Sequence, residues 1–194
     1  IQSAFADQAY IKIGEAKAKK SSLGFPYFNN LGSKNSGAAT ATAAEIYTTA
    51  QKDLELSTYF QMVQGSAFLE DPTKTGIKPF PGQQNGFKYE PLKTAQIEFV
   101  IRTGYEVSGN DITLEMYLYH VAESKLIVGK RYKASAAQAR QIGHTLANDI
   151  LEALTGVRGP FMSKIVFTSD RNSKSQSKEV FTMNWDGSEI EQQS

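Results

Sequence analysis

The clearest alternation of apolar and polar positions lies in residues 95–133, where three runs are separated by short turns. In the middle run every second residue from 112 to 118 is apolar, which is typical of a strand buried on one face. The connecting segments, SGND and AESK, are rich in the residues that hairpin turns require. The pattern predicts an antiparallel meander of three strands.

Two segments, 38–52 and 135–156, have helical periodicity instead. In both, apolar residues recur at spacings of three and four, so that each helix has one apolar face. The second helix also has termination signals, because Ser135 and Gln138 fit a capping box and Gly156 stands at the C-cap. We therefore predict an α/β fold in which two main helices pack on a mixed sheet.

Shorter apolar runs predict strands at 10–14, 23–28 and 57–63. Pro26 has no backbone N–H, so the second run must lie at a sheet edge or leave the sheet at that point. Residues 65–91 are rich in proline and glycine and predict a surface loop without regular structure, with a functional lid as the alternative.

The last part of the chain has the pattern of a β-hairpin. Residues 165–168 and 179–184 read as strands, and a Trp-Asp-Gly turn follows at 185–187. Because a lone hairpin is marginally stable in water, we expect these strands to be disordered, folded back, or paired with a neighbouring chain. We divide the chain into an α/β domain, 1–163, and a hairpin stub, 164–194, and interpret it as the front part of a longer protein.

Composition limits the classes of partner. The 194 residues carry a net charge of +1, which provides no broad electrostatic field for nucleic acid or anionic lipid. The absence of cysteine excludes disulfides, thiolate metal sites and a cysteine nucleophile. No apolar run approaches the ~20 residues that span a bilayer, so we expect no membrane insertion. Composition does not identify the compartment.

Few residues suggest catalysis. The two histidines, His120 and His144, have no acid or histidine at metal-ligand spacing, and the serine nucleophile motif is absent. We interpret both histidines as structural, with His144 on the helix flank, hydrogen-bonded to nearby backbone. The sequence therefore predicts no catalytic residue, no metal and no cofactor.

One segment resembles a phosphate-binding loop. GSKNSG, at 32–37, lies between a predicted strand and a predicted helix. A P-loop continues with Lys and Ser or Thr, whereas Ala38 and Ala39 follow here. A nucleotide- or small-molecule-binding enzyme domain that uses residues 29–37 is the alternative to a non-enzymatic domain.

The C-terminal third carries a family resemblance. RQIGHTLANDILEALTGVRGPFMSKIVFTSDR, at 140–171, resembles the segment of the bacterial TolB family that joins its N-terminal domain to its β-propeller; the matching elements are His144, Asp149, LTG and GPF. The final strands resemble the opening of that family's first propeller blade. YIKIG followed by GFPYF is similar to the family's first strand pair.

The resemblance implies an α/β domain similar to anticodon-binding domains, followed by the first two strands of a propeller. It implies a non-catalytic scaffold in the periplasm, part of the Tol–Pal system that supports outer-membrane integrity and cell division. An RNA-binding module is suggested only by the anticodon-domain-like fold, and a fold does not establish a function.

The resemblance also implies partners. In the family the propeller binds the lipoprotein Pal, so we expect no Pal binding by this chain. The N-terminal segment binds the C-terminal domain of TolA, and the corresponding residues are Ala9, Tyr10, Ile11, Lys12, Ile13 and Gly14. The alternative is that Tyr10–Gly14 is an internal strand of the fold.

Overall fold

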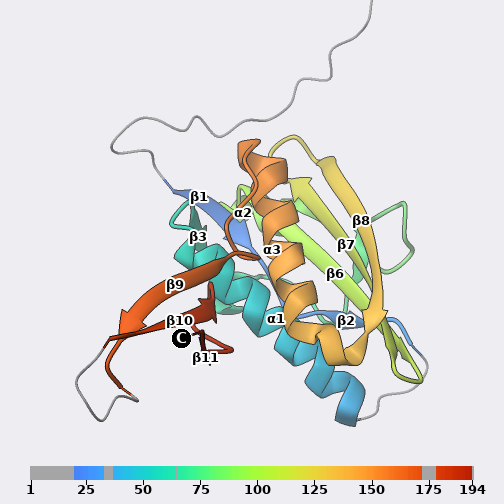
Figure 1. The fold of residues 1–194 in the computed structure, drawn as a ribbon. Coiled ribbons are helices and arrows are strands. Elements are labelled where there is room, and N and C mark those ends of the chain that lie inside the picture. The colour runs from blue at the N-terminus through green and yellow to red at the C-terminus, as the bar shows by residue number, and fades with distance from the viewer. Residues whose placement is uncertain (1–19, 33–36, 64, 172–177, 194) are drawn as a thin grey trace, which may run out of the picture.

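The computed structural model describes residues 20–32, 37–63, 65–171 and 178–193, and shows an α/β body with a smaller C-terminal sheet (Figure 1). The main sheet has the order β3-β1-β6-β7-β8, with β2 paired to β6. Its strands are β1 (Ser21–Gly24), β2 (Asn29–Asn30), β3 (Phe60–Met62), β6 (Phe99–Ser108), β7 (Asp111–His120) and β8 (Lys125–Ser135). Because β1 is parallel to β3 and β6 while β6, β7 and β8 form an antiparallel meander, the predicted mixed sheet is confirmed.

Two long helices, α1 (Gly37–Leu56) and α3 (Ala139–Thr155), lie side by side on one face of this sheet (Figure 1). A 3-10 turn, η2 (Ala136–Gln138), precedes α3, and the Ser135 hydroxyl accepts a hydrogen bond from the Ala137 N–H. Gly156 has the left-handed φ of 74° predicted for a C-cap. The Gln138 side chain contacts Gln141 instead of reaching back, so only half of the predicted capping box forms.

Buried apolar side chains lie on both faces of the sheet. On the helix side, Leu114, Met116 and Leu118 of β7 are fully buried against α1 and α3. On the other side, Val100 and Tyr119 pack with residues that include Leu92 of α2 (Tyr89–Thr94). The alternation along β6 and β7 thus places neighbouring residues in two cores.

The predicted strand at 23–28 is wrong in its second half. The strand in this region is β1, which ends at Gly24, and Phe25 and Phe28 pack around the Tyr47 ring of α1 instead. The departure agrees with the expectation for Pro26. The strand predicted at 57–63 is shorter, as β3, and the one predicted at 10–14 lies outside the described residues.

The prediction that 65–91 lacks regular structure is also wrong. This region contains η1 (Gly65–Ala67), β4 (Gly76–Pro79), β5 (Gly86–Phe87) and the first residues of α2. The buried Arg102 guanidinium orders it, because Nη2 donates to the carbonyl oxygens of Pro72 and Thr75 at 2.6 and 2.9 Å. Burial lowers the pKa of Arg102 to about 10, which still leaves it charged at neutral pH.

The C-terminal sheet contains β9 (Lys164–Ser169), β10 (Glu179–Asn184) and β11 (Glu191–Gln192). The predicted antiparallel hairpin is confirmed, but β11 is a third strand that the sequence pattern did not reveal. The sheet folds back on the body, because Trp185 packs against Phe161 with ring centroids 6.1 Å apart. Of the three expected outcomes for these strands, this is the folded-back one.

Candidate functional site

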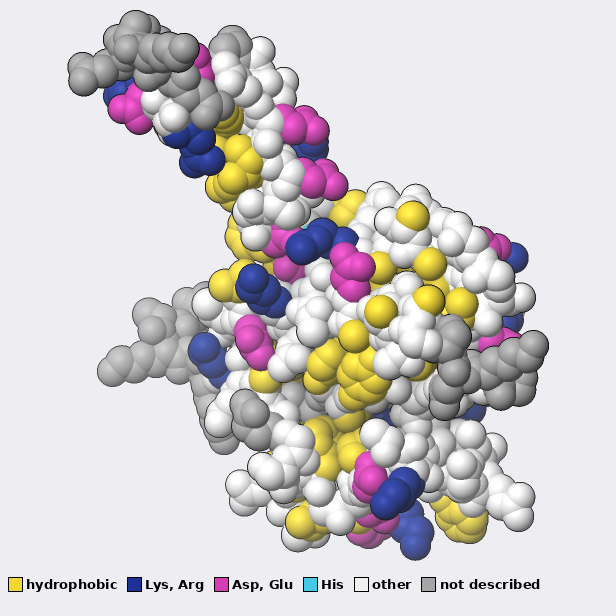
Figure 2. All heavy atoms as spheres, turned by 90° about the horizontal axis from the view of Figure 1, so that it is seen from below, with side chains coloured by type: hydrophobic (Ala, Val, Ile, Leu, Met, Phe, Trp, Pro, Cys, Tyr) yellow, Lys and Arg dark blue, Asp and Glu magenta, His cyan; other side chains and the backbone are white. Residues whose placement is uncertain are grey.

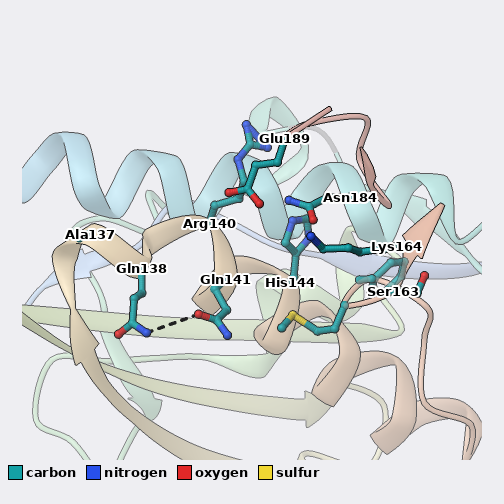
Figure 3. A pocket seen from close by; sticks show the side chains of 11 residues that line it. Ala137, Gln138, Arg140, Gln141, His144, Ser163, Lys164, Asn184 and Glu189 are labelled. Carbon is teal, nitrogen blue, oxygen red and sulfur yellow. Dashed lines mark hydrogen bonds between the residues drawn. The ribbon is translucent and has the colours of Figure 1, made fainter. Parts of the chain in front are cut away.

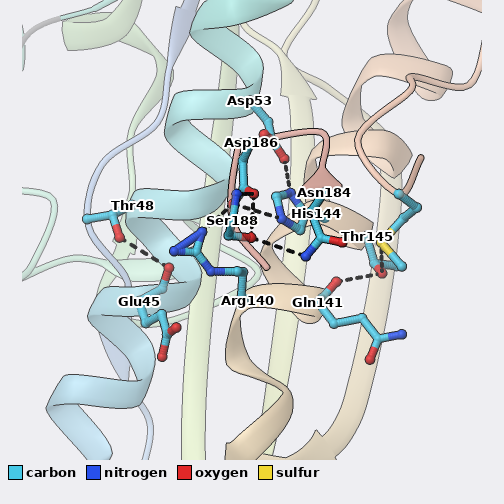
Figure 4. A network of polar contacts seen from close by, with 11 residues as sticks. Glu45, Thr48, Asp53, Arg140, Gln141, His144, Thr145, Asn184, Asp186 and Ser188 are labelled. Carbon is cyan, nitrogen blue, oxygen red and sulfur yellow. Dashed lines mark hydrogen bonds and ion pairs between the residues drawn. The ribbon is translucent and has the colours of Figure 1, made fainter. Parts of the chain in front are cut away.

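A buried polar cluster joins α1, α3 and the turn that follows β10 (Figure 4). It consists of Asp53 from α1, Arg140 and His144 from α3, and Asp186 from the turn. The side chains of Asp53, His144 and Asp186 are at most 6% exposed. The cluster lies where the α/β body meets the C-terminal sheet.

His144 lies between two carboxylates. Its Nδ1 is 2.6 Å from Asp53 Oδ2, and its Nε2 is 3.4 Å from Asp186 Oδ2. Arg140 Nη1 contacts the same oxygen of Asp186. The expectation that His144 bonds to nearby backbone on the helix flank is wrong, because its partners are 91 residues before it and 42 after it in sequence, and it is buried between them.

The close packing of α1 on α3 creates this geometry. A Cβ added at Gly143 would lie 2.7 Å from Thr49 Cβ and 2.9 Å from the Ile46 carbonyl oxygen, so only glycine fits without a shift. The neighbouring His144 therefore reaches the flank of α1 where Asp53 lies. Gly143 is in this respect the residue that allows the Asp53–His144 contact.

The two carboxylates have opposite pKa shifts. Burial raises the pKa of Asp53, while the hydrogen bond and charge of His144 oppose that rise. Burial acts in the same direction on Asp186, but hydrogen bonds from the Ser188 hydroxyl and backbone N–H, with Arg140 beside them, hold its pKa below the ordinary value. Asp186 is thus the firmly ionised anion of the cluster.

The cluster compensates charge and lacks the arrangement of a nucleophilic site. An Asp–His pair is two-thirds of a catalytic triad, but the free nitrogen must then face a nucleophile. Here Nε2 faces the Asp186 carboxylate and makes no hydrogen bond within the described residues. Each carboxylate of the cluster contacts a nitrogen-bearing side chain, Asp53 through His144 and Asp186 through Arg140 and His144.

A cavity of about 380 Å³ opens beside the cluster, between the start of α3 and the C-terminal sheet (Figure 3). Its polar lining combines three carboxamides with two cations, one anion and His144. These residues are Gln138, Gln141, Asn184, Arg140, Lys164, Glu189 and His144. Carboxamides both donate and accept hydrogen bonds, so this part of the lining can bind neutral polar groups.

Metal-ligand groups and membrane-spanning helices are absent from the part of the chain that the structure describes. No group of three or more metal-ligating side chains occurs there. None of the helices described is long and apolar enough to cross a bilayer. His120, as expected, has a structural contact: its Nδ1 accepts the Glu123 N–H at 3.2 Å.

The predicted partner-binding residues, Ala9 to Gly14, lie outside the described residues. Of the alternative site at 29–37, the structure describes 29–32 and 37. The Asn29 amide donates to the Pro72 and Thr75 carbonyl oxygens, and the Asn30 side chain accepts from the Gly32 N–H. These side chains therefore contact the protein's own backbone.

Sequence reasoning missed Asp53, Arg140 and Asp186. One signal was present, because Asp53 follows Ile46 by seven residues and so lies on the apolar face of α1, where a carboxylate needs a partner. His144, inside an amphipathic helix, needs a partner for the same reason. Nothing in the pattern marks Asp186, which the folding of the turn brings to this site.

The chain was compared with known proteins. The family described as "TolB amino-terminal domain" matches residues 9–127, more than half of the chain. A Tol-Pal system protein TolB from Geobacter metallireducens is 36% identical over 154 residues, which cover 79% of this chain and 33% of that protein. The protein of the same name from Geobacter sulfurreducens is 27% identical over 186 residues, which cover 96% of this chain and 40% of that protein.

A solved structure agrees at the level of the fold. The crystal structure of TolB from Acinetobacter baumannii superposes with a TM-score of 0.66 at 17% identity, covering 94% of this chain and 40% of that one. The α/β fold class predicted from the sequence is confirmed. The chain spans between a third and two fifths of the length of these relatives.

Proposed function

The chain belongs to the TolB amino-terminal domain family, and from this premise we propose that it is a non-catalytic interaction domain of the Tol–Pal system in the periplasm. The observation that carries the proposal is the family match over residues 9–127, together with relatives that are named Tol-Pal system proteins. In the cluster around His144 the Nε2 atom lies 3.4 Å from the Asp186 carboxylate, a placement that suits a structural role for this histidine.

The partner in this proposal is the C-terminal domain of TolA, bound through residues 9–14. This segment lies at the start of the region matched by the family. Its sequence, AYIKIG, has aromatic and β-branched residues on both sides of Lys12, which suits an extended strand. Such a segment can add to the edge of a partner's sheet, where backbone hydrogen bonds supply affinity and side chains supply specificity.

The decisive experiment compares the full chain with a variant that lacks residues 1–13. We expect isothermal titration with a TolA C-terminal domain to show binding by the full chain and none by the variant. The thermal midpoint should be nearly unchanged, because the core of the body is formed by described residues from 21 onward. Unchanged binding by the shortened chain would refute this site.

Point substitutions sharpen the test. Ile11→Asp places a charge in the extended segment and should abolish binding, whereas Leu69→Asp changes an apolar side chain that is 64% exposed elsewhere and should not. A large fall in the thermal midpoint of Ile11→Asp would instead favour an internal strand at 10–14. Nucleotides should give no heat beyond dilution, and RNA should show no salt-dependent shift in a gel.

We also propose the division of the chain at residue 163, with 164–194 as the beginning of a first propeller blade. The antiparallel β9–β10 pair and its short third strand have the local form of a blade. A chain ending at 163 should remain folded, with equal or higher monomer content by size-exclusion chromatography. Greater aggregation of the shortened chain would contradict this division.

A further inference from the structure

The outer edge of β8 is a long strand edge without a neighbour among the described residues. β8 is the last strand of the main sheet, is 11 residues long and pairs with β7 on its inner side (Figure 1). An unpaired strand edge presents a row of backbone N–H and C=O groups that can receive another strand. Proteins commonly protect such edges with charged side chains.

The charges on β8 are all positive. The strand contains Lys125, Lys130, Arg131 and Lys133 and no acidic residue. Lys130 forms an ion pair with the body, because its Nζ is 3.0 Å from the nearly buried Asp149 carboxylate. The same carboxylate accepts a hydrogen bond from the Tyr132 hydroxyl.

Two of the other three cations lie in the second half of the strand. Arg131 and Lys133 point to the sheet face opposite the helices and are 69% and 72% exposed. Each lies 3.7 Å from a carboxylate of β7, and exposed pairs of this kind contribute little free energy. Both can therefore exchange their β7 partner for an acidic side chain on an added strand.

A groove of about 450 Å³ accompanies the same edge on the helix side. Tyr132, Lys133 and Ala134 of β8 line one side, and Ile142 and Thr145 of α3 line the other. Gln138 and Gln141 also line the groove, and Figure 3 shows their side chains next to each other. A side chain that points from an added strand toward the helices would enter this groove, since strand side chains alternate between faces.

We propose that the β8 edge binds an extended acidic segment of a partner protein by strand addition. The partner's backbone pairs with β8, alternate acidic side chains lie opposite Arg131 and Lys133, and an apolar side chain between them occupies the groove. The positive charges of Arg131 and Lys133 favour an acidic strand over a neutral or basic one. A second copy of this chain is disfavoured, because two β8 edges would place cations opposite cations.

The test uses the full chain and a synthetic ten-residue peptide in which glutamate alternates with threonine, with one central leucine. A second peptide has lysine in place of every glutamate. We expect the acidic peptide to shift the amide resonances of β8 and to slow their hydrogen exchange, with weaker binding at higher salt. The lysine peptide should produce no shifts.

Two variants localise the contact. The double variant Arg131→Glu with Lys133→Glu should weaken binding of the acidic peptide roughly tenfold or more, since each substitution replaces attraction with repulsion. Gln141→Trp, at an exposed position, should weaken binding by filling the groove. Lys93→Glu on α2 is the matched control and should leave binding unchanged.

Several results would overturn the proposal. The first two are equal binding of both peptides, and changes in amide resonances that lie away from β8. The others are no binding of the acidic peptide at millimolar concentration, and hydrogen-exchange protection of β8 that increases with protein concentration in the absence of peptide. The chain lacking residues 1–13 should still bind the peptide. This separates failure here from failure of the TolA site.

Discussion

The α/β body and the C-terminal sheet are held together by different kinds of contact. In the body, buried apolar side chains from two helices and the main sheet form one continuous cluster. Within the described residues 164–171 and 178–193, Phe181 is the one hydrophobic side chain that is buried. The sheet is attached through the Phe161–Trp185 contact and the polar cluster of Asp186, Arg140 and His144.

This difference predicts two levels of stability within one chain. Regions with few buried apolar contacts open at lower free energy than the core of a domain. The body should therefore unfold cooperatively, whereas the C-terminal sheet should open on its own. On the face shown in Figure 2, cations and anions are interspersed. Attachment of the sheet depends on specific pairs, Phe161 with Trp185 and Arg140 with Asp186.

The largest expected effect is at the contact between α1 and α3 inside the polar cluster. Asp53→Ala removes the carboxylate at 2.6 Å from His144 and leaves Nδ1 of that buried ring without its partner. Breaking a buried pair in this way costs about 3–5 kcal/mol of the free energy of unfolding. Chemical denaturation measures it, with Glu55→Ala on the exposed side of the same helix as control. A loss below about 1 kcal/mol would mean that the pair is not a stabilising contact.

The second prediction separates the two regions directly. Leu146→Ala truncates a fully buried side chain of α3 and should reduce the free energy of global unfolding by about 2–5 kcal/mol. Phe181→Ala removes the ring stacked 5.5 Å from Phe167 and should abolish hydrogen-exchange protection in the C-terminal sheet of β9, β10 and β11 alone. Equal shifts of the global unfolding midpoint in both variants would show that body and sheet unfold as one unit.

The smallest effect is a pH dependence. The pKa of Asp186 is lower in the folded chain than in the unfolded chain, so its ionisation stabilises the fold above the unfolded pKa. This contribution should shrink progressively as pH falls below about 4, the ordinary pKa of an aspartate, and should be lost as pH passes through the lower pKa of the folded state. The difference in unfolding free energy between the wild type and Asp186→Asn should therefore shrink in acid. Asp170→Asn, at an exposed position of the same region, is the control for the substitution itself.

The spacing of apolar residues predicted the helices and strands that have one buried apolar face and one more polar face. The meander of β6, β7 and β8 and the helix α3 follow from alternation and from a stripe at helical spacing, and Gly156 ends the helix as predicted. The region 65–91 was mispredicted, because its order comes from Arg102, whose contacts cross from a distant strand. The strand predicted at 23–28 was too long, because the apolar side chains of Phe25 and Phe28 pack on the Tyr47 ring and are not part of a strand.

The sequence alone determined the fold class, the two main helices, the meander and the resemblance to a family, since these depend on residues near one another in the chain. Only the tertiary structure decided which ionisable groups meet, because Asp53, His144 and Asp186 come from three separate elements. It also decided that β8 is the last strand of its sheet, with a groove beside it. Such long-range contacts depend on how helices and strands pack together, so the spacing of apolar residues within one segment does not predict them.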